Sequence, residues 1–105
     1  MVRISIFYPN TTGGRFDTDY YINKHMPMSI EKQGTALKGV SVELGLTEEF
    51  PGTQTSYIAM CHLLYDSVEA FQLAFAPHAE VLTKDMINYT NIEPVIQVSE
   101  VKIYL

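Results

Sequence analysis

The sequence predicts an α+β fold in which one four-stranded antiparallel sheet is covered on one face by two helical segments. Apolar side chains alternate with a period of two in four segments and recur at helical spacing in two others. The segments follow the order β-α-β-β-α-β, for which short connections and right-handed crossovers favour such a sheet. The 105 residues, of which 47% are hydrophobic, suffice for one domain with its own core, spanning 1–105.

The first strand is predicted over Val2–Tyr8, and Pro9–Gly14 then supplies the proline and glycines of a turn. The glycine pair lacks the spacing of a phosphate-binding loop, so a plain turn is the better interpretation. The two faces of the strand carry Val2, Ile4 and Ile6 on one side and Arg3, Ser5 and Phe7 on the other.

The first helix is predicted to begin at Asp17, an N-cap, with Phe16 and Tyr21 as a hydrophobic staple. Its pattern continues to Gly34, a residue suited to the end of a helix. Pro27 removes a hydrogen bond within this run, so we expect a kink or a break near His25 to Pro27.

Two further strands are predicted over Leu37–Thr47 and Ser56–Tyr65, joined by a polar loop over Glu48–Thr55. The second of these is apolar on both faces, which predicts a central place in the sheet. Asp66 or Ser67 is expected to cap the second helix. The remaining predicted elements are an aromatic ridge of Phe71 and Phe75, a helix end at Pro77, helical turns over Ala79–Asp85, a turn over Asn88–Asn91 and a strand over Pro94–Tyr104.

This element order is the ferredoxin-like sandwich, and it leaves one face of the sheet uncovered. Arg3, Ser5 and Phe7 would lie on that face, which is too apolar to leave wholly in water. A second copy packing sheet to sheet would cover it, so we expect a homodimer.

Composition excludes several classes of partner. The net charge is -5 and the seven basic residues are scattered, which argues against nucleic acid. No apolar run approaches a membrane span, and a single cysteine, Cys61, suits a reducing compartment. We expect a cytoplasmic protein that makes no membrane contact.

The most distinctive stretch combines a helix start, two adjacent tyrosines and a histidine before Met-Pro-Met. Its residues are Phe16, Asp17, Asp19, Tyr20, Tyr21, Lys24, His25, Met26, Pro27 and Met28. A second stretch, Thr90–Val101, reads Thr-Asn-Ile-Glu-Pro-Val-Ile-Gln-Val-Ser-Glu-Val. Together they resemble the EthD family of dimeric α+β barrel proteins, element by element over essentially the whole chain.

The resemblance implies a dimer whose two sheets form a barrel, with a cavity between each sheet and its helices. The family is named after a protein encoded beside a cytochrome P450 system that degrades ethyl tert-butyl ether. The resemblance therefore implies a role in the oxidative catabolism of a small hydrophobic molecule, with a monooxygenase system as a pathway partner. The broader barrel group includes isomerases, polyketide cyclases, cofactor-free monooxygenases and haem-degrading enzymes, which use a pocket histidine as acid, base or ligand.

His25 occupies the position of the histidine in the EthD motif and shares a helical face with Tyr21. An imidazole beside a phenol is suited to proton transfer, because both of its protonation states are populated near neutrality. The structural alternative is that His25 bonds the backbone carbonyl freed by Pro27. His78 is a further catalytic candidate, since Pro77-His78-Ala79 resembles the Pro-Ala-His segment of the cyclases with the histidine shifted by one position. Asp85 could orient it.

The substrate pocket is expected to be lined by apolar and phenolic side chains: Tyr8, Tyr20, Met28, Phe71 and Phe75. His62 lies in mid-strand, where a core or interface histidine is the commoner outcome, and Cys61 is best interpreted as a buried hydrophobe. No residue spacing predicts a metal site, and no cofactor is expected.

Two functions are compatible with these features. The first is a cofactor-independent oxidoreductase, isomerase or cyclase that uses His25. The second is a binding or accessory protein for a monooxygenase system, without chemistry of its own.

Overall fold

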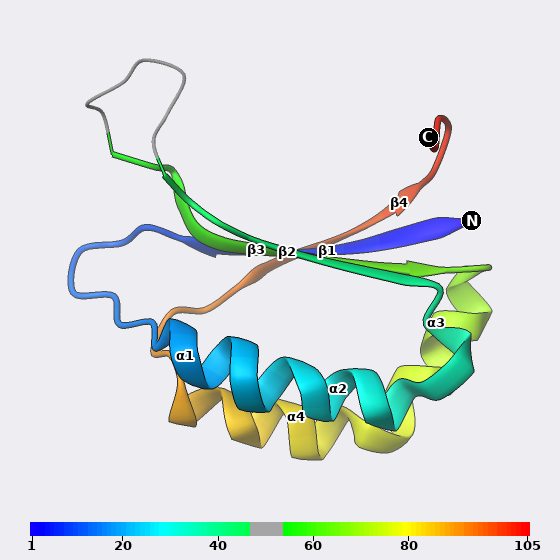
Figure 1. The fold of residues 1–105 in the computed structure, drawn as a ribbon, viewed down its shortest axis with the longest axis horizontal. Coiled ribbons are helices and arrows are strands. Elements are labelled where there is room, and N and C mark those ends of the chain that lie inside the picture. Colours follow the sequence, from blue (N-terminus) through cyan, green and yellow to red (C-terminus); the bar gives the residue numbers. More distant parts are fainter. Residues whose placement is uncertain (47–53) are drawn as a thin grey trace.

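The structure is a computed structural model that describes residues 1–46 and 54–105 (Figure 1). Thr47 and most of the predicted loop over Glu48–Thr55 lie outside the described residues. The strands are β1 (Val2–Pro9), β2 (Gly39–Leu44), β3 (Tyr57–Tyr65) and β4 (Val95–Glu100). The first helical segment consists of α1 (Thr18–Tyr20), η1 (Tyr21–His25), α2 (Met26–Gln33) and η2 (Gly34–Ala36). The second consists of α3 (Val68–Phe75), η3 (Ala76–His78), α4 (Ala79–Asp85) and η4 (Met86–Asn88).

The four strands form one sheet in the order β2-β3-β1-β4, with antiparallel pairing throughout. β3 is therefore central, as its apolar character on both faces predicts. Both helical segments lie on the same face of the sheet and run in opposite directions beneath it (Figure 1). This is the ferredoxin-like α+β fold that the sequence predicts.

The first helical segment begins as predicted and differs at the proline. The Asp17 carboxylate accepts a hydrogen bond from the Tyr20 amide at 3.1 Å, and the Phe16 and Tyr21 rings lie 5.0 Å apart as a staple. The segment does not break near Pro27. Instead η1 is a π-helical turn, in which the Met26 amide bonds the Tyr21 carbonyl, and α2 continues directly from it. The wider turn accommodates the proline, whose missing N–H falls in the first turn of α2.

The second helical segment is capped by Ser67, whose hydroxyl accepts from the Ala70 amide at 3.0 Å. Asp66, the alternative cap, is exposed outside the helix. As predicted, α3 ends just before Pro77, at Phe75, and α4 spans Ala79–Asp85. Pro77 itself lies in η3, a 3-10 turn that joins the two helices. Proline is tolerated there because the first amides of a helical turn have no partner inside it.

Two strands are shorter than predicted. β2 begins at Gly39, because the Leu37 amide bonds the Gly34 carbonyl at the end of the preceding turn. β4 ends at Glu100, which pairs with Val2, and one further bond from the Val101 amide to the Met1 carbonyl at 3.0 Å follows it. The C-terminal residues turn away from the helices (Figure 1).

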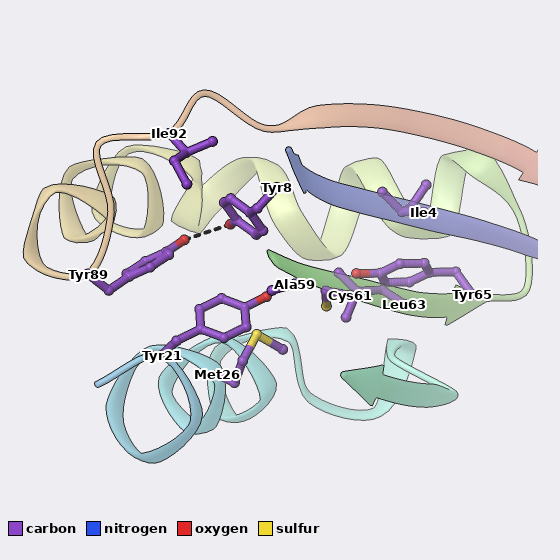
Figure 2. Packing of buried hydrophobic residues seen from close by; sticks show 10 residues of the cluster. All are labelled: Ile4, Tyr8, Tyr21, Met26, Ala59, Cys61, Leu63, Tyr65, Tyr89 and Ile92. Atoms are coloured by element: carbon purple, nitrogen blue, oxygen red, sulfur yellow. Dashed lines mark hydrogen bonds between the residues drawn. The ribbon is translucent and has the colours of Figure 1, made fainter. Parts of the chain in front are cut away.

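The core fills the space between the sheet and the helices. Tyr8, Tyr21 and Tyr89 gather at one end of it, and Ile4 and Tyr65 lie towards the other (Figure 2). The opposite face of the sheet carries Arg3, Ser5 and Phe7 from β1, as predicted, beside Leu64, His62 and Met60 of β3. Among the described residues, no helix is long and apolar enough to cross a membrane.

Candidate functional site

A cavity of about 110 Å³ lies between the sheet and the two helical segments. Most of its wall is aliphatic or aromatic, and the polar groups that reach it are one imidazole and a few hydroxyls. Such a small apolar space with few polar groups has the character of a ligand site. The lining residues are Ile6, Tyr8, Tyr21, His25, Met26, Ser29, Cys61, Leu63, Phe75, Leu82, Thr83, Met86, Tyr89, Pro94 and Ile96.

His25 is the titratable imidazole of this wall. It ends the π-helical turn η1, and its residue is only 8% exposed. Its ring lies 4.6 Å from the Tyr89 ring and 5.7 Å from the Tyr21 ring, which it stacks on at 14°. The imidazole is therefore held between two phenols from different parts of the chain.

The Nδ1 atom of His25 lies 2.9 Å from Oδ2 of Asp85, at the end of α4. Nδ1 thus bonds a carboxylate, and the predicted alternative, a bond to the carbonyl freed by Pro27, is not what occupies this nitrogen. Because Asp85 does not line the cavity and His25 does, Nε2 is the ring nitrogen left for a ligand.

Asp85 is held by three hydrogen-bond partners. Its Oδ1 accepts from the Tyr20 hydroxyl at 2.7 Å and from the Asn88 amide at 3.0 Å, and its Oδ2 faces His25. Burial alone would raise the pKa of Asp85, but these hydrogen bonds outweigh it and hold the pKa below its ordinary value of 3.8. Asp85 is therefore ionised at neutral pH and fixes the imidazole opposite it.

Three buried phenols complete the wall. The Tyr8 and Tyr89 hydroxyl oxygens lie 2.8 Å apart, and Tyr21 points its hydroxyl towards Cys61 (Figure 2). Burial raises the pKa of all three phenols. Burial likewise raises the pKa of the Cys61 thiol to about 11, so the cysteine is a neutral core residue.

Four of the residues predicted from the sequence line the cavity: His25, Tyr21, Tyr8 and Phe75. The other four do not. Tyr20 lies behind the wall, where it bonds Asp85 and stacks on the Tyr89 ring at 6.4 Å. Phe71 packs on the Tyr65 ring at 5.2 Å, and Met28 and His78 are half-buried away from the cavity wall.

The sequence does not predict two of the residues that contact His25. Asp85 is predicted to orient His78, but in the structure it bonds His25, 60 residues away along the chain. Tyr89 falls within the turn predicted over Asn88–Asn91 and is given no specific role at the site. The one available signal was its position close after Asp85, beyond a single turn.

His62 lies on the other face of the sheet and takes no part in this cavity. Its Nδ1 lies 2.8 Å from the Ser5 hydroxyl and its Nε2 3.4 Å from the Glu43 carboxylate. This cluster forms part of an open groove of about 680 Å³, lined also by Arg3 and the C-terminal residues. The groove is larger than the cavity, but it is shallow, lies open to solvent and is lined by charged groups of both signs.

No three His, Cys, Asp or Glu side chains gather as metal ligands within residues 1–46 and 54–105. At the cavity, a carboxylate orients an imidazole, an arrangement that can transfer a proton.

Comparison with protein-family models finds no match, and neither does a search of curated proteins. Solved structures do match. An EthD-like protein from Ralstonia eutropha JMP134 is 39% identical, with a TM-score of 0.92 over 97% of this chain and 92% of its own. An ethyl tert-butyl ether d (EthD) family protein from Bacillus halodurans C-125 is 20% identical, with a TM-score of 0.73 over 95% and 97%.

A dimeric protein of ferredoxin-like fold from Bacteroides fragilis NCTC 9343 is 12% identical, with a TM-score of 0.54 over 95% of each chain. At that identity the likeness concerns the fold alone. The match at 39% identity over nearly both whole chains is close enough to establish common family membership.

Proposed function

The chain belongs to the EthD family, and on that premise we propose that it binds a compact apolar molecule in the cavity and transfers a proton on it through His25. The observation that carries this proposal is the contact of 2.9 Å between His25 Nδ1 and Asp85 at the cavity wall. A base that is oriented in this way, in a mostly apolar cavity, is suited to remove a proton from a bound molecule.

The His25–Asp85 pair suits general acid and base catalysis. With its Nδ1–H donated to Asp85, the neutral imidazole keeps its free lone pair on Nε2, which can remove a proton from a ligand. The imidazolium that forms lies beside the Asp85 carboxylate, which stabilises its charge and keeps the ring oriented for the return of the proton.

The cavity limits the size of the ligand. At about 110 Å³ it is somewhat smaller than an engineered apolar cavity of about 150 Å³ that binds benzene. The ligand is therefore of the size of one ring or a short branched chain. Binding of such a molecule is compatible with a catabolic role for the protein, as a cofactor-independent isomerase, cyclase or oxidoreductase. It is equally compatible with a protein that carries the molecule for a monooxygenase.

The open face of the sheet supports a second proposal, that two copies pack sheet to sheet as a homodimer. Phe7, Met60 and Val95 form an apolar row across neighbouring strands of this face. Val95 is 53% exposed. The related fold from Bacteroides fragilis is described as dimeric. An apolar sheet face of this kind is normally covered by another layer.

The proton-transfer proposal is tested with nitroethane, a small carbon acid whose exchange of hydrogen for deuterium in heavy water is followed by proton NMR. The wild-type protein is expected to accelerate the exchange, and His25→Ala to lose the acceleration, because no other imidazole lines the described cavity. His78→Ala is the matched control and should retain it.

Equal acceleration by wild type and His25→Ala would reject His25 as the base. Binding of small apolar molecules without any acceleration would instead favour the accessory binding role, with no chemistry by this chain.

A further inference from the structure

We propose that the paired hydroxyls of Tyr8 and Tyr89 are an oxyanion-binding site, and that the substrate class is a compact carbonyl compound with an acidic hydrogen on the adjacent carbon. This inference rests on the proposed function, since it assigns His25 the removal of that hydrogen. It adds a second polar site, at which the substrate oxygen is bound.

The two phenols reach the cavity from opposite sides. Tyr8 comes from β1 and Tyr89 follows η4, and both rings line the cavity while their residues are 3% and 0% exposed. Their hydroxyl oxygens are 2.8 Å apart, and they meet between the sheet and the second helical segment (Figure 2). Burying two hydroxyl groups stabilises a core less than burying apolar side chains of similar size, because each hydroxyl needs a hydrogen-bond partner.

The hydrogen-bond count leaves one donor. Two hydroxyls carry two protons, and their mutual bond uses one of them whichever oxygen donates. The hydroxyl that accepts retains its own proton for a further acceptor, and the neighbouring Tyr21 hydroxyl, which interacts with Tyr8 and Cys61, adds a third proton to the group. An oxygen atom of a bound ligand is such an acceptor, and a carbonyl oxygen that gains negative charge accepts more strongly than a neutral one.

The phenols stay protonated while this happens. Burial raises the pKa of both Tyr8 and Tyr89, so both remain neutral donors across the physiological range. The cavity wall itself contains no carboxylate among the described residues. Negative charge that develops on a ligand oxygen thus meets neutral donors in a mostly apolar cavity, where such bonds act more strongly than in bulk water.

The base stands next to this site. The His25 ring lies 4.6 Å from the Tyr89 ring. In the reaction His25 Nε2 takes the hydrogen on the carbon adjacent to the carbonyl as a proton. The electron pair of the broken C–H bond forms a C=C bond, and the carbonyl π pair moves to oxygen. The imidazolium then returns the proton to the oxygen, which gives an enol, or, where a further C=C bond is conjugated with the enolate, to the far carbon of that bond, so the step needs no oxidant or reductant.

The inference is tested by binding of para-fluorophenol, which resembles an enol, and of fluorobenzene, which has the same ring without the oxygen, both followed by fluorine NMR. Wild-type protein is expected to bind para-fluorophenol at least about tenfold more tightly. At least one of Tyr8→Phe and Tyr89→Phe, the variant that lacks the hydroxyl bonded to the ligand, should remove about tenfold of the affinity for para-fluorophenol and leave that for fluorobenzene unchanged. Tyr57→Phe, outside the cavity, is the matched control and should change neither.

Equal affinity of the wild-type protein for the two probes would overturn the inference, and this comparison needs no variant to fold. Equal loss of both probes in a folded Tyr8 or Tyr89 variant would also overturn it, because only packing would then be lost. The experiments can reject the His25 base and the oxyanion site independently of each other. Nitroethane exchange that depends on His25, together with equal probe affinities, would reject the oxyanion site alone. A preference for para-fluorophenol, together with exchange that survives His25→Ala, would reject the base alone.

Discussion

Tyr20 lies outside the cavity and holds Asp85 in place, which makes it a positioning residue, while its ring stacks on the Tyr89 ring at 6.4 Å. Its hydroxyl donates to Asp85 Oδ1 at 2.7 Å, and Asp85 in turn contacts His25 on its other oxygen. Asn88 bonds the same Oδ1 at 3.0 Å and the Tyr20 hydroxyl at 3.3 Å. A small polar cluster outside the cavity thus fixes the carboxylate that orients the imidazole inside it.

We expect Tyr20→Phe to raise the pKa of Asp85 towards or above 3.8, because burial is then opposed by fewer hydrogen bonds. A carboxyl group whose folded pKa is depressed stabilises the fold above its unfolded pKa and loses this contribution as pH falls through the folded value. The variant should therefore show less of the wild-type loss of stability below pH 3.8. NMR titration of the Asp85 carboxyl and urea unfolding at several pH values measure the two effects.

Tyr104→Phe removes an exposed hydroxyl far from Asp85 and is the control for this measurement. An unchanged Asp85 titration in Tyr20→Phe would contradict the positioning role.

The sequence predicts the imidazole of the candidate site, His25, and not Asp85 or Tyr89, which contact it from elsewhere in the chain. The sequence motif singles out His25, because tyrosines and a proline surround it at a helical spacing. The same motif cannot indicate Asp85 or Tyr89, because Asp85 lies on the second helical segment and Tyr89 directly after it. Both meet His25 only once the two segments pack on one sheet face. Residue spacing along one helix predicts neighbours on that helix and not across to another.

At the scale of elements, the two helix caps differ in what they support. Asp17 caps the segment that carries His25, and Ser67 caps the segment that carries Asp85. Asp17→Ala and Ser67→Ala should each lower the free energy of unfolding by about 1 kcal/mol, since each leaves one backbone amide without its acceptor. Urea unfolding measures both, and Asp66→Ala should leave stability nearly unchanged. A loss in Asp66→Ala as large as in Ser67→Ala would contradict the assignment of the cap.

The π-helical turn marks the limit of prediction for elements. Pro27 correctly indicates an irregularity at His25, but local rules favour a kink or a break. Tertiary packing favours a π-helical turn instead. Tyr21, His25 and Met26 are all buried, and a turn with one additional residue brings all three side chains inward while the helix continues. Neither the packing partners nor their depth can be derived from the sequence of one helix.

At the scale of the whole molecule, the element order was sufficient to predict the fold. Four strands and two helical segments in this order have few arrangements in which every apolar stripe is buried, so strand order and the covered face follow from pattern alone. Side-chain patterning on the other face also identified Arg3, Ser5 and Phe7 correctly. It did not predict that Ser5 and Glu43 would flank His62, because this contact depends on the register of three strands.

The exposed apolar row on that face leads to the last prediction, which concerns assembly. If a second copy covers the sheet, Val95→Glu should shift the protein from dimer to monomer, because it would bury an unpaired carboxylate in the interface. Val95 is already 53% exposed in one chain, so the substitution should leave the fold itself intact. Ile87→Glu, on a 75% exposed side chain of η4 on the helical side, is the matched control. Sedimentation equilibrium at micromolar concentration distinguishes the states. A wild-type protein with the mass of one chain would exclude the dimer, and a Val95→Glu variant that remains dimeric would place the interface on another surface.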